Sequence, residues 1–199
     1  MLTLCMDTAY KYLSLALIKD GEILAAIDEP CFKKQSELLF VKLGELFEKA
    51  NLKPLDIDSV CISEGPGSYT GVRIAMSVAK TICEVANFDL YKISTLRLYA
   101  NDQEDTMVLL DARANRAYVG VYDKSEIIEE DKAESLENID LGEHNLVGDL
   151  SLFGKEDYMP KISECFKNTM HAWEKQENIA YMVPKYLKES DSYYRWISH

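Results

Sequence analysis

A glycine-rich stretch at residues 64–71, EGPGSYTG, has the residue types that phosphate-binding loops use. Glycine lets a backbone approach a phosphate closely, and the free N–H groups at a helix start attract anions. The stretch nevertheless lacks the lysine of a Walker loop, and a threonine replaces the third glycine of the dinucleotide-binding pattern. It is therefore better explained as a tight turn in which Ser68 or Thr70 caps the next helix, although an anion from a neighbouring molecule could still bind there. The signature residues are Gly65, Pro66, Gly67, Ser68, Tyr69, Thr70 and Gly71.

Two aspartates are the other residues that could bind a ligand or take part in a reaction. Asp7 closes the apolar run LTLCMD, and Asp111 closes the run MVLLD about a hundred residues later. Carboxylates at strand ends can hold a metal-bound phosphate. The three histidines, His144, His171 and His199, stand far apart and have no second ligand at metal-binding spacing. Ser68 lies in no GxSxG motif, so we expect neither a catalytic metal site nor a hydrolytic triad.

These residues must be positioned by a regular order of elements. Apolar runs predict three strands joined as an antiparallel meander, with a turn at Asp20-Gly21. A helix over 36–51 follows, with Ser36 as its cap and Asn51 at its end. The strand SVCIS, a helix over 69–86 and the strand YKISTL complete the first half.

The second half begins in the same way, because residues 107–123 again read as strand, turn and strand. It then departs from the plan in an acidic stretch, residues 124–143, before a strand in 144–150 and a helix over 161–178. We expect residues 179–196 to pack back on the body.

Two similar halves predict an α/β, actin-like (ASKHA, ribonuclease-H-like) duplicated fold. The first lobe would span residues 1–100, and a smaller, degenerate second lobe residues 101–199. Ligands of this fold lie between the lobes, and its kinases have a glycine just after the first aspartate. Thr8, Ala9 and the bulky Tyr10 stand there instead. We therefore expect a degenerate cleft that turns over no nucleotide.

Composition narrows the function classes. The 199 residues are 47% hydrophobic and carry a net charge of −12, and the acidic stretch alone has eight acids against two bases. Such a chain repels phosphate backbones, so any role with nucleic acid would be indirect. We expect no membrane span, no secretory signal and a cytoplasmic location, with the five cysteines as buried free thiols.

The two long helices each carry more apolar surface than one sheet requires. In the helix over 36–51, Leu39, Leu43, Leu46 and Ala50 form one stripe, and Phe40, Gly44 and Phe47 form another. The helix over 69–86 likewise has two stripes. Surplus apolar surface predicts a partner that completes a helical bundle, unless the second lobe or the C-terminal tail covers it.

Several of these segments resemble the bacterial TsaB (YeaZ-type) family. The resemblance rests on GPGSYTGVRI, on the opening LTLCMDTAYKYLSLALIKDGEIL, on QSELLFVKLGELFEKANL and on LLDARANRAYVGVYD. It covers about the first 120 residues, and PKYLK at 184–188 is similar to the family's short ending. One departure is Gln35, where many relatives have a histidine.

The resemblance implies a non-catalytic scaffold subunit. It would bind and stabilise a TsaD-type catalytic subunit in the complex that makes N6-threonylcarbamoyladenosine at position 37 of tRNA. A TsaE-type ATPase would dock at that heterodimer, tRNA would be reached only through the complex, and the isolated chain could form a homodimer. ATP or ADP and metal would then belong to the partner subunits, with no cofactor bound by this chain alone.

The partner interface implied for the two helices consists of Leu39, Phe40, Leu43, Gly44, Phe47, Val72, Arg73, Met76, Ala79, Lys80 and Cys83. The alternative is an actin-like ATPase or phosphotransferase acting alone, with Asp7 and Asp111 as its metal-linked carboxylates.

Overall fold

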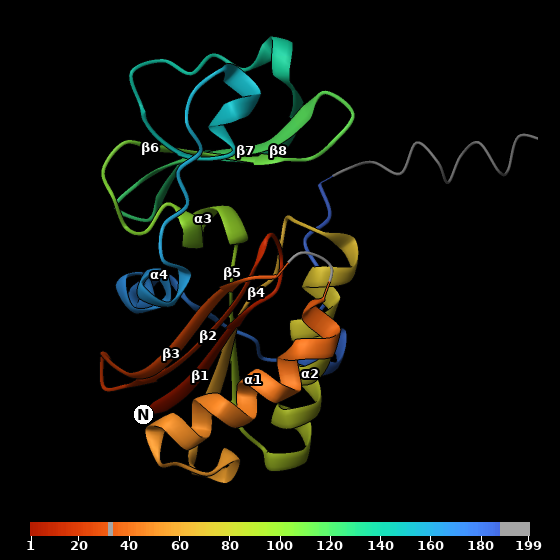
Figure 1. The fold of residues 1–199 in the computed structure, drawn as a ribbon, viewed down its shortest axis with the longest axis vertical. Coiled ribbons are helices and arrows are strands. Elements are labelled where there is room, and N and C mark those ends of the chain that lie inside the picture. Colours follow the sequence, from red (N-terminus) through yellow and green to blue (C-terminus); the bar gives the residue numbers. More distant parts are fainter. Residues whose placement is uncertain (32–33, 188–199) are drawn as a thin grey trace, which may run out of the picture.

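The computed structural model describes residues 1–31 and 34–187, which form two stacked lobes (Figure 1). The first lobe holds a six-stranded sheet in the order β10-β5-β4-β1-β2-β3. Its strands are β1 (Leu2–Asp7), β2 (Tyr12–Lys19), β3 (Glu22–Pro30), β4 (Ser59–Ser63), β5 (Asp89–Ile93) and β10 (Glu174–Lys175). The second lobe holds a four-stranded sheet in the order β8-β7-β6-β9. Its strands are β6 (Thr106–Asp111), β7 (Arg116–Asp123), β8 (Glu126–Ser135) and β9 (Asn145–Gly148).

The two sheets share one topology. In each sheet the first three strands form an antiparallel meander, and a fourth strand pairs in parallel with the first. The predicted actin-like duplicated α/β fold is thereby confirmed. The division at residue 100 stays a prediction, because β10 and the helix before it, which come from the second half of the chain, both pack on the first sheet.

Helices cover both faces of the first sheet. On one face lie α1 (Gln35–Ala50) and α2 (Tyr69–Ala86), whose apolar stripes join the sheet in one core. On the other face lie α3 (Thr95–Tyr99) and α4 (Ile162–Asn168), which stand between the lobes in Figure 1. A second core, which includes Tyr99, Tyr122 and Phe166, therefore connects the two sheets. Short 3-10 turns occupy Pro54–Asp56, Leu136–Asn138, Leu150–Phe153, Met170–Ala172 and Ile179–Tyr181.

Local signals explain most element ends. Asp20 and Gly21 take positive φ in the first hairpin, and Asn51 and Asn87 end α1 and α2 in the left-handed conformation. Ser68 caps α2 as expected, since its Oγ accepts from the Gly71 N–H at 3.2 Å. All five cysteines are free and buried, as the sequence indicated.

Some element predictions were wrong. Ser36 does not cap α1, because the helix starts one residue earlier and Lys34 holds the cap position without a side-chain bond. The helix expected over 161–178 ends at Asn168 and gives way to a 3-10 turn and β10. The acidic stretch contains the full strand β8, so the second half keeps the meander that the sequence seemed to lose. Residues 188–196 of the expected C-terminal packing lie outside the described residues. Within the described ranges, no helix is long and apolar enough to cross a membrane.

Candidate functional site

The two strand-end aspartates perform the same local task in the two halves. Asp7 accepts a hydrogen bond from the Ala9 N–H at 2.9 Å, and Asp111 accepts one from the Arg113 N–H at 2.7 Å. Each carboxylate thus braces the backbone two residues on, as aspartates in Asx turns do. The predicted equivalence of Asp7 and Asp111 therefore extends to their hydrogen bonds.

Asp7 is further enclosed at the junction of the lobes. Its side chain is fully buried and also accepts from the Ser63 hydroxyl and, at 2.7 Å, from the Tyr99 hydroxyl. Burial raises the pKa of the Asp7 carboxyl, and the bonds from Ser63, Ala9 and Tyr99 oppose that rise only in part. Both of its carboxylate oxygens accept hydrogen bonds from groups of the same chain.

A contact that the sequence did not reveal joins the lobes beside this cluster. The Tyr10 hydroxyl donates to Asp149, whose side chain is 3% exposed, and the Lys11 ammonium pairs with the same carboxylate. The Asp111 N–H also donates to Asp149, at 2.7 Å. Burial, followed by the bond to Asp149, raises the pKa of the Tyr10 hydroxyl, so Tyr10 remains a neutral donor. The bulky residue at the expected glycine position therefore connects the lobes.

The glycine-rich loop packs on the turn that follows Asp7. The Ser68 N–H donates to the Ala9 carbonyl at 2.7 Å, and the Thr8 hydroxyl donates to the Gly71 carbonyl at 2.6 Å. A Cβ on Gly67 would stand 2.3 Å from the Ala9 carbonyl oxygen, and one on Gly71 would stand 2.2 Å from that of Thr8. The chain itself requires glycine at these two positions, because two backbone segments meet there.

The region around the end of β1, where the sequence suggested a ligand site, is consequently lined by groups that already bond one another. The turn after Asp7, the loop at 65–71 and the pair Tyr10–Asp149 account for its hydrogen bonds. The Gln35 side chain, the residue that departs from the family pattern, donates to the Tyr10 carbonyl at 3.0 Å. Among the described residues, no cluster of three or more His, Cys, Asp and Glu side chains is arranged for a metal ion.

The second candidate surface is the outer face of α1 and α2, where the structure separates the exposed from the buried residues of the predicted interface. Most of the predicted interface residues are buried in the chain's own first core: Leu39, Leu43, Phe47, Val72, Met76, Ala79 and Cys83. The apolar pattern could not tell which stripe of each helix faces the sheet. A charged residue at Met76 or Phe47 would disrupt this core, so such variants do not test partner binding.

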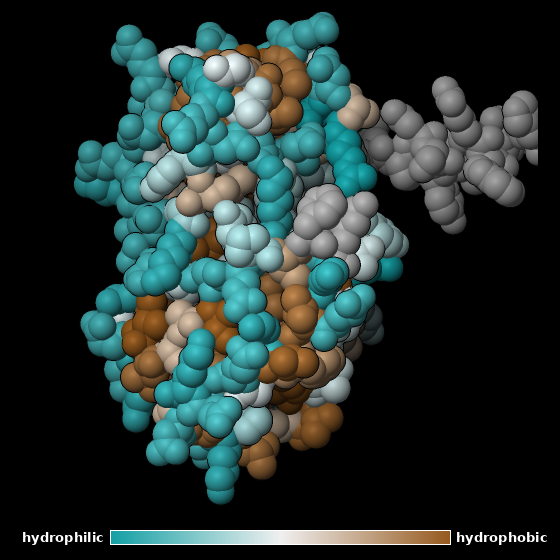
Figure 2. Space-filling view, viewed as in Figure 1, coloured by the Kyte–Doolittle hydropathy of each residue, from teal (hydrophilic) through white to brown (hydrophobic). Residues whose placement is uncertain are grey.

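The remaining predicted residues do lie at or near the surface. Phe40 is 68% exposed, Gly44 and Arg73 are exposed, and Lys80 is partly exposed. Val41, 57% exposed, and Val85, 83% exposed, add apolar surface that the sequence list omitted. Figure 2 shows hydrophobic side chains at the surface of this part of the first lobe. Large exposed apolar side chains on neighbouring helices are typical of protein contact sites.

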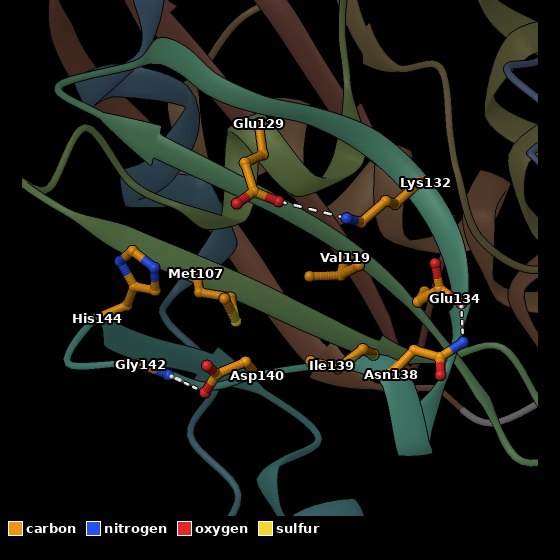
Figure 3. A pocket seen from close by; sticks show the side chains of 10 residues that line it. All are labelled: Met107, Val119, Glu129, Lys132, Glu134, Asn138, Ile139, Asp140, Gly142 and His144. Carbon is orange, nitrogen blue, oxygen red and sulfur yellow. Dashed lines mark hydrogen bonds and ion pairs between the residues drawn. The ribbon is translucent and has the colours of Figure 1, made fainter.

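A shallow groove lies elsewhere, on the outer face of the second sheet (Figure 3). It encloses about 280 Å³ and is lined by Met107, Val119, Glu129, Lys132, Glu134, Asn138, Ile139, Asp140, Gly142 and His144. Within it Lys132 pairs with Glu129 at 3.4 Å, Glu134 accepts from the Asn138 amide at 3.1 Å, and Asp140 accepts from the Gly142 N–H at 3.1 Å. The groove lies on the face of the second sheet that points away from the junction of the lobes, so it is separate from both candidate surfaces.

Comparison with known proteins places these features in context. A family model described as "TsaD: tRNA N6-adenosine threonylcarbamoyltransferase" matches residues 29–141, more than half of the chain. The "tRNA threonylcarbamoyladenosine biosynthesis protein TsaB" of Bacillus subtilis is 30% identical over 126 residues, which cover 61% of this chain and 55% of that protein. The Escherichia coli protein of the same name is 28% identical over 132 residues, covering 63% of this chain and 57% of that protein. The chain thus spans little more than half the length of these curated relatives.

The fold is similar to a solved structure over almost its whole length. "YeaZ from Pseudomonas aeruginosa" has a TM-score of 0.80 and 19% sequence identity, and the match covers 94% of this chain and 99% of that one. At this identity the likeness concerns the fold.

The packing of the glycine-rich loop can be tested with two helical glycines that differ in surroundings. Gly71→Ala should lower the free energy of unfolding by about 1–3 kcal/mol, because its Cβ meets the Thr8 carbonyl. Gly44→Ala is the control, since nothing lies within 4 Å of its added Cβ and alanine favours a helix by about 0.5–1 kcal/mol. Urea denaturation followed by circular dichroism measures both. Equal tolerance of alanine at the two positions would contradict the described loop packing.

The buried Asp7 predicts a pH dependence. Its folded-state pKa lies above the ordinary value of 3.8, so the folded chain holds this proton more tightly than the unfolded chain. The corresponding stability is complete below pH 3.8 and is lost as pH rises through the folded-state pKa.

Asp7→Asn removes this titration. The difference in unfolding free energy between Asp7→Asn and the parent should therefore shift in favour of the variant as pH rises from about 4. Urea titrations of both proteins at a series of pH values measure the difference. A difference that stays constant with pH would show that Asp7 titrates normally.

Proposed function

Because the chain belongs to the TsaD family and is of the TsaB/YeaZ type, we propose that it acts in the biosynthesis of N6-threonylcarbamoyladenosine at position 37 of tRNA. Its role is that of a non-catalytic subunit, which binds a TsaD-type catalytic subunit and stabilises it. The names of the relatives support the role in biosynthesis. The exposed surface of this chain supports the role in binding a partner.

The observation that carries the proposal is the exposed apolar face of α1 and α2. Phe40 and Val41 on α1 and Val85 on α2 are each more than half exposed to water. Ile74 and Val78 of α2 are partly buried and pack against the first core. Burying a phenylalanine or valine of this kind against a partner contributes roughly 1.5–3 kcal/mol per side chain.

Gly44 gives this face a second feature of a helix-binding surface. It sits inside α1, where glycine destabilises a helix by about 0.5–1 kcal/mol relative to alanine. Nothing in the described chain lies within 4 Å of the Cβ that it lacks. Nothing in the described chain needs this glycine, whereas a partner helix could approach the backbone of α1 closely at this position.

The strand-end cluster supports a non-catalytic role. The oxygens of Asp7 and the hydroxyl of Tyr10 bond within the chain at the place where an actin-like kinase holds its nucleotide. We therefore assign ATP or ADP and metal to the partner subunits, including a TsaE-type ATPase at the heterodimer. The net charge of −12 agrees with tRNA being reached through the complex, since an acidic chain repels a polyphosphate.

Mixing this chain with the TsaD-type protein of the same organism tests the proposal. Gel filtration with light scattering should give the mass of a 1:1 heterodimer at micromolar concentrations. The chain alone, run at the same concentrations, shows whether it forms a homodimer through the same face. No complex at tens of micromolar would refute the partner role and leave the fold unaffected.

Two surface variants then locate the interface. Phe40→Asp and Gly44→Leu should each weaken the heterodimer at least about tenfold, because one introduces a charge and the other fills the space for a partner helix. Gly44→Leu should at the same time leave the isolated chain as stable or more stable. Isothermal titration calorimetry measures the affinity.

The matched control is Leu55→Asp, since Leu55 is 79% exposed on the same lobe but lies outside α1 and α2. It should bind like the parent chain. If Phe40→Asp and Gly44→Leu also bind like the parent, the interface lies elsewhere.

A further inference from the structure

The C-terminal residues 179–187, here called the latch segment, take an unusual path over both lobes. β10 first adds a short strand to the edge of the first sheet, next to β5. In Figure 1 the chain (blue) then reaches the side of α2 and rises beside it towards the second lobe. The latch segment has little regular structure of its own, so its position depends on specific contacts.

Its contacts with the first lobe follow α2 in the reverse direction. The Lys80 ammonium donates to the carbonyls of Ala180 at 2.8 Å and Met182 at 3.1 Å. Met182 is 5% exposed and joins the first core. Near the start of α2, Tyr186 stacks on Tyr69, with ring centroids 5.3 Å apart, and its hydroxyl accepts from Arg73 at 2.9 Å. The latch segment is thus attached along the length of α2.

Lys185 connects this attachment to the second lobe. Its N–H donates to the Glu64 carbonyl at 2.8 Å, just before the glycine-rich loop. Its ammonium pairs at 2.8 Å with Asp131 of β8, whose side chain is 2% exposed. Asp131 also accepts from Ser94 and Tyr122, and among the described residues its recorded ion pair is with Lys185. A carboxylate buried to this degree needs a cation, because desolvation otherwise opposes its charge.

The Lys185–Asp131 pair and the contacts of Asp149 join the lobes at different edges of the second sheet. Asp131 lies on β8, at one edge of the second sheet, and Asp149 directly follows β9, at the other edge. Asp149 is held by Tyr10 and Lys11 of the first lobe, and Asp131 by Ser94 and Lys185. Between these edges the shared core and the Arg97–Ser125 hydrogen bond also join the lobes, so the Lys185–Asp131 pair restrains the β8 edge in particular.

We propose that the latch segment is a releasable fastening that fixes the angle between the lobes, with Lys185 as its decisive contact. When the Lys185–Asp131 pair is broken, the Ser94–Asp131 bond and the shared core remain, and the β8 edge moves more widely relative to the first lobe while the Asp149 edge stays attached. Because the latch segment lies on α2, the angle of the second lobe is connected to the same helix that carries the exposed apolar face.

The test compares Lys185→Met with Lys175→Met in the full chain. Lys175 is the control because its ion pair, with Asp89 at 2.9 Å, lies within the first lobe and both partners are about half exposed. Spin labels at Glu48→Cys on α1 and Glu137→Cys beyond β8 report the distance between the lobes, since the five native cysteines are buried. Lys185→Met should gain a longer-distance population and show faster hydrogen exchange in residues 179–187, and Lys175→Met should match the parent.

A second variant keeps the test decisive if Lys185→Met does not fold. Asp131→Asn removes the charge attraction without leaving an unpaired buried charge. Asp131→Asn should speed hydrogen exchange in residues 179–187. The separate variant Lys185→Arg keeps a cation opposite Asp131 and should behave like the parent. Parent-like distances and exchange in both Lys185→Met and Asp131→Asn would overturn the proposal. Because the isolated chain is used, either result is independent of partner binding.

Discussion

The close packing of two backbone segments, residues 8–9 against residues 67–71, is the constraint on which the first lobe depends. Side chains on Gly67 or Gly71 would overlap the carbonyls of Ala9 and Thr8. The contact fixes where α2 begins, because Ser68 both bonds to the turn and caps the helix. The glycines that resemble a nucleotide-binding motif therefore allow the loop at 67–71 to pack on the turn at residues 8–9.

Much of this architecture could be predicted from the sequence. Apolar runs gave the three strands of the first meander and the first two of the second, and Asn51 gave the end of α1. β8 was missed because it is an edge strand whose exposed residues include acids such as Glu129 and Glu130, which interrupt the apolar pattern. Charged residues on edge strands are common, since they oppose pairing with other chains. The short α4 was overestimated because its apolar pattern continues into a 3-10 turn.

The candidate sites were predictable in position but not in detail. Asp7 and Asp111 were found from the repeat, yet their burial and partners depend on residues distant in sequence, such as Tyr99 and Asp149. Likewise both stripes of α1 are apolar, and only the packed structure shows that Leu43 faces the sheet while Phe40 faces water. A periodic pattern states that a helix has two apolar stripes; it contains no information on which one the sheet covers.

Several surface residues lower the stability of the isolated chain, and its own fold does not explain why they are there. Phe40 and Val85 stay in water, and Gly44 weakens a helix in which alanine would fit. On the proposed function these costs are offset when a partner helix covers the face. Such a face must also be held in a fixed orientation if it is to place a partner relative to the rest of the complex. Contacts at Asp149 and Asp131 join the lobes at opposite edges of the second sheet, in addition to the core that the two sheets share. Tyr10 and Lys11 thus hold the two lobes together, and the outer surface of α1 and α2 is the place where we propose that the chain acts on another molecule.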